Sequence, residues 1–154
     1  MCFSSEVEIE ALAIVSQFVS AEQCKLLLRN SCLILRVVLN YRNARRQKDH
    51  RYNCFDGTIF EASHFLKILK NLAAADESVA EMIIFEEGLE EISAAIQMDP
   101  NSCIEGVDFF WEVLYGTEIL WYILFAENGK HVFRTRLERG LLAGIHNISI
   151  QIYS

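Results

Sequence analysis

Apolar residues recur every three to four positions along most of this chain, and the helices that they predict fall into three similar sets. The sets lie within residues 6–42, 58–98 and 102–139, and each has a long, a short and a medium helix. The expected helices are 6–19, 21–29 and 31–42, then 58–75, 77–87 and 88–98, then 102–115, 118–128 and 130–139. Strand-like alternation occurs only at residues 147–153. Because 154 residues is an ordinary single-domain length, the sequence predicts one all-α domain.

The three sets repeat with a period of about forty residues. When Gln17, Asn71 and Tyr115 are placed in register, the spacings are 54 and 44 residues. The longer first spacing reflects an expected loop at residues 43–57, where apolar positions are scarce. Helical units of this length stack side by side because none buries its apolar face alone. The sequence therefore predicts a stack of about three units with a divergent tail at residues 140–154.

Short polar signals set the expected helix ends. Ser20 is typical of a helix start, and Asp76 is expected to cap the short helix that follows it. Gly88 is expected to end that helix in the left-handed conformation. Residues 99–102 are expected to start another helix, since an aspartate and a proline stand at its beginning.

Residues 65–89 carry the motif that points to a family. They read Phe-Leu-Lys-Ile-Leu-Lys-Asn-Leu-Ala-Ala-Ala-Asp-Glu-Ser-Val-Ala-Glu-Met-Ile-Ile-Phe-Glu-Glu-Gly-Leu. The segment resembles an armadillo repeat, in which a helix ends in Asn-Leu-Ala and a short helix leads to a glycine. The resemblance extends over residues 6–139 and is weakest in the third unit. It implies a right-handed α-superhelix of the armadillo and HEAT kind that serves as a non-catalytic protein-interaction scaffold.

The resemblance also implies which residues line a groove. In the importin and catenin members, the long helix of each repeat presents a tryptophan and, four residues later, an asparagine to an extended peptide. Asn71 and Trp111 match these positions, whereas Lys67 stands at a tryptophan position and Tyr115 at an asparagine position. A modified groove is therefore expected to contain Gln17, Asn71, Trp111 and Tyr115. The alternative for Trp111 is a place in the core.

Charge is segregated along the chain, whose formal net charge is −7. Residues 71–129 contain thirteen acidic residues and no Lys or Arg, which leaves +6 on the remainder. Such a division steers partners of opposite sign, although it also suits a solvated surface. The predicted partner is a basic or mixed-charge protein segment, and the acidic residues expected to contact it are Glu86, Glu87, Glu90 and Glu91.

The basic residues clustered in and beside the expected loop at residues 43–57 suggest an alternative function. Small helical trafficking domains of the ENTH and VHS kind have a similar length, and basic patches attract anionic lipid headgroups. A peripheral membrane adaptor would use the cations in and beside the expected loop, Arg42, Arg45, Arg46, Lys48 and Arg51. The acidic net charge disfavours a nucleic-acid partner.

Residue patterns that carry enzyme chemistry are not found in this sequence. It has no glycine-rich phosphate loop, no Gly-x-Ser-x-Gly and no His-Glu-x-x-His. The five cysteines lack the two-residue spacing of zinc and redox motifs. The chain is therefore expected to be no enzyme and to hold no metal or cofactor.

Two observations bear on location and assembly. No apolar run approaches the twenty residues of a membrane-spanning helix, and the N-terminal residues lack a secretory pattern. We therefore expect a cytoplasmic or nuclear protein. The apolar C-terminal end could hold two copies of the chain together.

Overall fold

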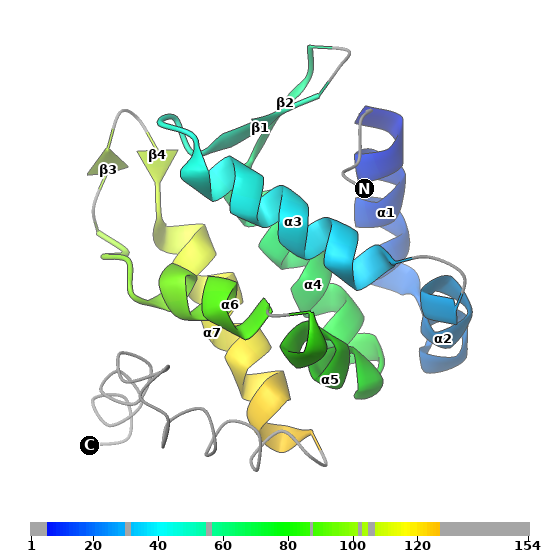
Figure 1. Cartoon of the computed structure of the whole chain (residues 1–154). Helices are drawn as coiled ribbons and strands as arrows, with labels where there is room; N and C mark the ends of the chain where they lie inside the picture. The colour runs from blue at the N-terminus through cyan, green and yellow to red at the C-terminus, as the bar shows by residue number, and fades with distance from the viewer. Residues whose placement is uncertain are drawn as a thin grey trace.

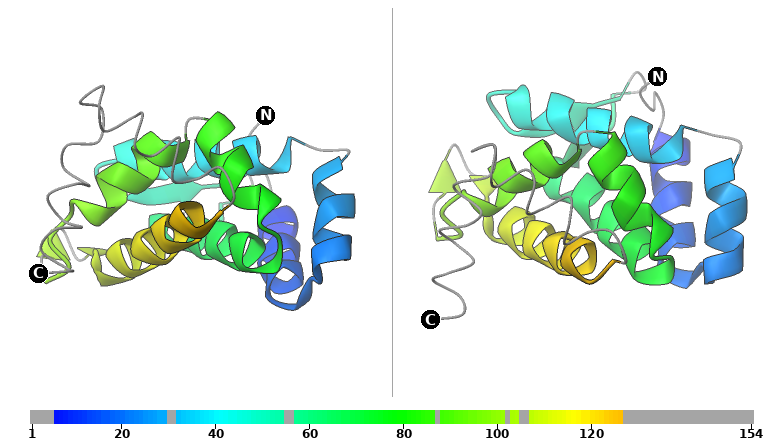
Figure 2. Two further views of the ribbon diagram at one scale, coloured as in Figure 1. Left: turned by 90° about the horizontal axis from the view of Figure 1, so that it is seen from below. Right: turned by 60° about the horizontal axis from the view of Figure 1, so that its bottom comes forward.

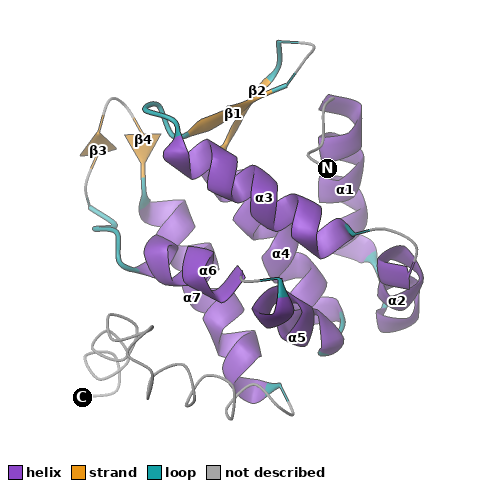
Figure 3. Cartoon of the chain, viewed as in Figure 1, coloured by secondary structure: helices purple, strands orange, loops and turns teal. Residues whose placement is uncertain are grey.

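The computed structural model describes residues 6–29, 32–54, 57–86, 88–101, 103–104 and 107–126. Helices dominate these ranges (Figure 1 and Figure 3), which confirms the expected all-α character. Two short hairpins accompany them. The helices are α1 (Glu6–Phe18), α2 (Ala21–Arg29), α3 (Leu33–Arg46), α4 (Ala62–Ala75), α5 (Ser78–Phe85), α6 (Gly88–Ile96) and α7 (Phe110–Phe125). The strands are β1 (Arg51–Asn53), β2 (Ile59–Glu61), β3 (Cys103–Ile104) and β4 (Val107–Asp108).

Three long helices lie side by side, with α4 in the middle. α4 contacts both α1 and α7, and Figure 2 shows the three helices in one layer. The helices α3, α5 and α6 lie over this layer, where α3 contacts α4 and α6 contacts α7. This arrangement surrounds α4 with neighbours.

The sequence of α4 explains its central place. Its apolar residues occupy a wide stripe at three- and four-residue steps, as a helix with several neighbours requires. Each such side chain that leaves water stabilises the fold by about 1.5–3 kcal/mol. The α4 residues that are at most 1% exposed are Ala62, Phe65, Leu66, Ile68, Leu69 and Leu72.

Two expected helix starts are confirmed by their hydrogen bonds. The backbone N–H of Ser20 donates to Oε1 of Gln23 at 3.0 Å, and the N–H of Gln23 donates to Oγ of Ser20 at 3.2 Å. This reciprocal pair is a capping box. The N–H of Ser78 donates to Oδ1 of Asp76 at 3.0 Å at the start of α5.

Gly88 does not have the conformation that the sequence predicts. It is the first residue of α6, and among the described glycines only Gly57 has a positive φ. A Cβ at Gly88 would lie 2.8 Å from the carbonyl oxygen of Ile83 and 3.2 Å from Cγ2 of Val38. A glycine is therefore needed here for close approach of α6 to α5 and α3.

The segment expected as a loop at residues 43–57 contains more structure than predicted. Helix α3 continues to Arg46, and β1 pairs with β2 in antiparallel register, with Tyr52 opposite Phe60. Gly57, with φ +88°, lies in the connection between the two strands. Strands of three residues are too short for an alternating pattern to stand out in the sequence.

The third unit also differs from the prediction. β3 pairs with β4 where a helix start is expected, and one helix, α7, replaces the two helices expected at 102–115 and 118–128. Gly116 lies inside α7, and a residue without a side chain suits this position because α7 packs closely on α6 there. A Cβ at Gly116 would lie 3.0 Å from Cγ2 of Ile96. The expected helix at 130–139, the strand-like residues 147–153 and the tail at 140–154 lie outside the described residues.

Candidate functional site

Glu91 joins the acidic and the basic parts of the sequence inside the molecule. Its side chain is 6% exposed, and its Oε1 accepts a hydrogen bond from Nε of Arg42 at 2.6 Å. Its Oε2 accepts another from Nε of Arg45 at 3.0 Å. A buried carboxylate requires such partners because desolvation of the charge is costly. Glu91 is therefore engaged within the fold rather than presented to a partner, and so are two of the five candidate cations.

The other charged candidates are dispersed. Glu90 is exposed on α6, Glu86 is partly buried after α5, and Glu87 lies outside the described residues. Arg46 and Lys48 are exposed at and beyond the end of α3, and Arg51 is partly buried on β1. Among the described members, neither set gathers around one exposed pocket.

A second buried carboxylate was not singled out by the sequence analysis. Glu112 on α7 is 1% exposed, and its Oε2 accepts a hydrogen bond from the Tyr41 hydroxyl at 2.8 Å. Nε2 of His50 lies 2.7 Å from Oε1 and 2.9 Å from Oε2 of the same carboxylate. Burial and the nearby Glu112 charge raise the pKa of Tyr41, so its hydroxyl remains a donor. One signal was available, because Glu112 precedes Gly116 and Leu120 at the four-residue steps of a buried helix face.

The exposed site with the most varied chemistry is a hollow of about 290 Å³ between β2, α4 and α7. We call it the α4–α7 hollow. The three residues of β2 form one part of its wall, and the remaining wall residues are Ser63, His64, Lys67, Trp111 and Tyr115. The expected groove residues Trp111 and Tyr115 thus come together with Lys67, at a position where the armadillo pattern has tryptophan.

Stacked rings shape this hollow. Trp111 stacks on Tyr115 with ring centroids 5.7 Å apart, and 46% of its surface remains exposed. His64 stacks on Phe60 with centroids 5.0 Å apart. Trp111 and Tyr115 are four residues apart on α7, which places both on one face of the helix. Trp111 is therefore a surface residue of the hollow and not a core residue.

The cations around the hollow differ in their partners. Nζ of Lys70 lies 5.6 Å from the Tyr115 ring centroid and 3.8 Å from Oε2 of Glu118. Lys67, one turn earlier on α4, forms no ion pair with a described residue. Burial, and to a smaller extent the Lys67 charge, lowers the pKa of His64 although Glu10 opposes this shift. At neutral pH, Lys67 therefore supplies the uncompensated positive charge on the α4 wall.

Two expected groove residues lie outside this hollow. Nδ2 of Asn71 donates to Oγ of Ser16 at 3.3 Å, which links α4 to α1. Gln17 is exposed on α1, whereas Trp111 lies on α7, and α4 contacts both helices. Of the expected groove residues, the two on α7 line the hollow, whereas Asn71 joins α4 to α1 through its hydrogen bond.

Comparison of the chain with protein-family models, with curated proteins and with solved structures gives no match. The site must therefore be interpreted from its own chemistry. Within the described ranges, no helix is long and apolar enough to cross a membrane, and no three His, Cys, Asp or Glu side chains converge as metal ligands.

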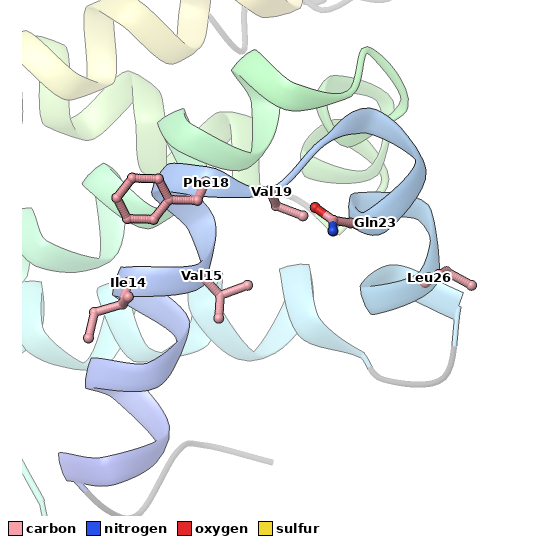
Figure 4. Close-up of a pocket in the computed structure, with 6 residues that line it drawn as sticks. All are labelled: Ile14, Val15, Phe18, Val19, Gln23 and Leu26. Atoms are coloured by element: carbon pink, nitrogen blue, oxygen red, sulfur yellow. The ribbon is translucent and has the colours of Figure 1, made fainter.

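A larger hollow of about 570 Å³ lies between α1 and α2 (Figure 4). Its wall is mostly apolar, and the exposed side chains include Ile14, Phe18 and Leu26. Its one amide side chain, that of Gln23, already accepts the capping hydrogen bond from Ser20. This hollow offers apolar area but few groups that would orient a ligand.

Proposed function

We propose that this chain is a short armadillo-like right-handed superhelix that acts as a non-catalytic protein-interaction scaffold. A segment of the partner protein lies across the α4–α7 hollow. The observation that carries the proposal is the half-exposed ring of Trp111, which is held in place by stacking on the ring of Tyr115. Exposed, well-supported aromatic rings in hollows contribute most of the binding free energy of many interfaces.

The repeated contacts between helices support the superhelical part of the proposal. The last helix of the first unit, α3, packs on the first helix of the second unit, α4. In the same way α6 packs on α7, and the long helices α1, α4 and α7 contact one another in order. Equivalent contacts between successive units are what a stacked repeat requires.

The charges of the hollow favour a partner segment of mixed charge. Lys67 and Glu61 both line it, and neither forms an ion pair with a described residue. Glu90, in contrast, lies on α6 in the other layer and is no part of this wall. Charged residues at the edge of an aromatic contact orient the ligand and select it.

The test compares two tryptophans of the same helix. Trp111 and Trp121 are 46% and 52% exposed, but only Trp111 lines the hollow. Wild-type protein, Trp111→Ala and Trp121→Ala are used to capture proteins from a cell extract, and the melting temperature of each variant is recorded. We expect proteins that wild type and Trp121→Ala retain and Trp111→Ala loses, with all three variants folded.

Equal loss in both variants would show non-specific adhesion to exposed rings. Unchanged capture by Trp111→Ala would remove the hollow from the interface and contradict the proposal. Unfolding of Trp111→Ala would be checked with Trp111→Lys, which keeps a long side chain at the surface but removes the ring.

A further inference from the structure

The unpaired charge of Lys67 in the α4–α7 hollow indicates which residues of the partner segment lie there. Its neighbour Lys70 is compensated by Glu118 at 3.8 Å. Lys67 is only partly exposed, and it lines the hollow together with the stacked rings of Trp111 and Tyr115. A partly buried charge interacts more strongly with an opposite charge than a fully hydrated one does.

His64, in the wall of the hollow, has a polar atom without a partner among the described residues. Its Nε2 is buried and makes no hydrogen bond with them. His64 precedes Lys67 by three residues, so both side chains lie on the same side of α4 and both line the hollow. A buried nitrogen that lacks a partner destabilises the free protein, and a ligand in the hollow does not contact this atom directly because it has almost no exposed surface.

The size of the hollow limits what binds there. A volume of about 290 Å³ is at the small end of the range for ligand sites, which extends to about 1,000 Å³. It accommodates one large side chain and the group next to it rather than an extended cofactor. The open surface of Trp111 suits a flat ring, because aromatic pairs prefer offset-stacked or edge-to-face contact.

Resting on the proposed function, we infer that the partner segment inserts an aromatic side chain against Trp111 and places an adjacent carboxylate on Lys67. The carboxylate comes from an aspartate or glutamate side chain or from the C-terminus of the partner. Glu61, which is exposed at the β2 edge of the hollow, disfavours a second acidic residue on that side. The recognised unit is thus a ring followed by a single negative charge.

The experiment uses tetrapeptides with blocked ends that contain Trp-Glu, Trp-Gln, Trp-Lys or Ala-Glu, together with a Trp peptide that has a free C-terminal carboxylate. Binding is followed by NMR through the indole N–H signals of the whole protein at millimolar peptide. We expect Trp-Glu to bind about threefold more tightly than Trp-Gln, as one partly exposed ion pair provides. Trp-Lys should be weaker still, and Ala-Glu should not bind. The free-carboxylate peptide shows which source of carboxylate is preferred.

Variants of Lys67 make the test specific. Lys67→Gln should abolish the preference for Trp-Glu, and Lys67→Glu should reverse it in favour of Trp-Lys. Lys25→Gln is the matched control, because Lys25 is an exposed cation on α2 away from the hollow. Binding to Trp111→Ala should be lost for every peptide.

Two results would overturn the inference. If Trp-Lys binds as tightly as Trp-Glu while Trp111→Ala loses both, the charge assignment is wrong and the proposed function stands. If no peptide shifts the Trp111 signal, the ring assignment is wrong as well, and the extract comparison of Trp111→Ala with Trp121→Ala decides the proposed function separately.

Discussion

His50 and Glu112 are 62 residues apart in the sequence, yet Nε2 of the histidine lies 2.7 Å from Oε1 of the glutamate. His50 follows α3 and has a positive φ of 59°, which costs a non-glycine residue about 1–2 kcal/mol. The ring also contacts Phe109 edge to face, with centroids 5.2 Å apart. Through this contact the segment between α3 and β1 is attached to the start of α7.

The Tyr41 hydroxyl is the other donor to the Glu112 carboxylate. Tyr41→Phe removes this hydrogen bond and leaves a buried charge short of one partner. We expect a loss of about 1.5–3 kcal/mol in the free energy of unfolding, as for hydrogen bonds to charged groups. Urea denaturation measures it. Tyr115→Phe is the control, because the Tyr115 hydroxyl makes no hydrogen bond with a described residue, and its effect should stay within about 0.5 kcal/mol.

Two adjacent glutamates on α6 have different surroundings, because Glu91 belongs to a buried ion pair and Glu90 is a surface charge. Glu91→Ala should destabilise the protein by about 3 kcal/mol, since it removes the shared partner of Arg42 and Arg45. Glu90→Ala should change stability by less than about 0.5 kcal/mol because Glu90 is exposed. Equal effects in thermal or urea denaturation would show that the Glu91 contacts do not stabilise the fold.

Protonation of His64 should weaken the folded state. Burial lowers its pKa from the ordinary value of 6.5, so the unfolded chain binds a proton more readily than the folded protein. The stability from neutral His64 is complete above a pH of about 6.5 and is lost as the pH falls through that value toward the folded pKa. NMR titration of the imidazole signals measures the folded pKa directly. A value above 6.5 would contradict the burial argument, and His64→Asn should flatten the pH dependence of the melting temperature.

The close contact of Gly88 with Ile83 should leave no room for a methyl group. Gly88→Ala places Cβ 2.8 Å from a backbone oxygen of α5, so we expect a loss of about 1–3 kcal/mol from overpacking. Gly57→Ala is a useful comparison. It meets no atom within 4 Å but must adopt a φ of +88°, which costs about 1–2 kcal/mol. If Gly88→Ala raises the melting temperature, the contact with Ile83 is looser than the structure indicates.

The helices of the first two predicted units were predictable because their apolar spacing is strong, and because polar residues cap the starts of α2 and α5. The bounds of α4, α5 and α6 follow the predicted ones within a few residues. The hairpins were missed because strands of two or three residues have no measurable period. Two helices were predicted where α7 is continuous, since the sequence does not show that α6 lies against Gly116.

The candidate site was predicted in part. Trp111 and Tyr115 do share an exposed surface, because a four-residue step fixes their relation on one helix. Glu91 and Glu112 were treated as members of an acidic surface, whereas both carboxylates are buried. Their partners lie on α3 and just beyond it, at separations of 46 to 71 residues, which helical spacing cannot reveal.

The position of α4 between α1 and α7 bears on how the chain is made. Synthesis runs from α1 toward α7, so the side of α4 that α7 covers has no cover until residue 125 has left the ribosome. At ordinary translation rates this interval lasts roughly 3–10 s. During that time the nascent chain presents part of its future core to water, and a chain that stops before α7 keeps that surface open to chaperones and proteases.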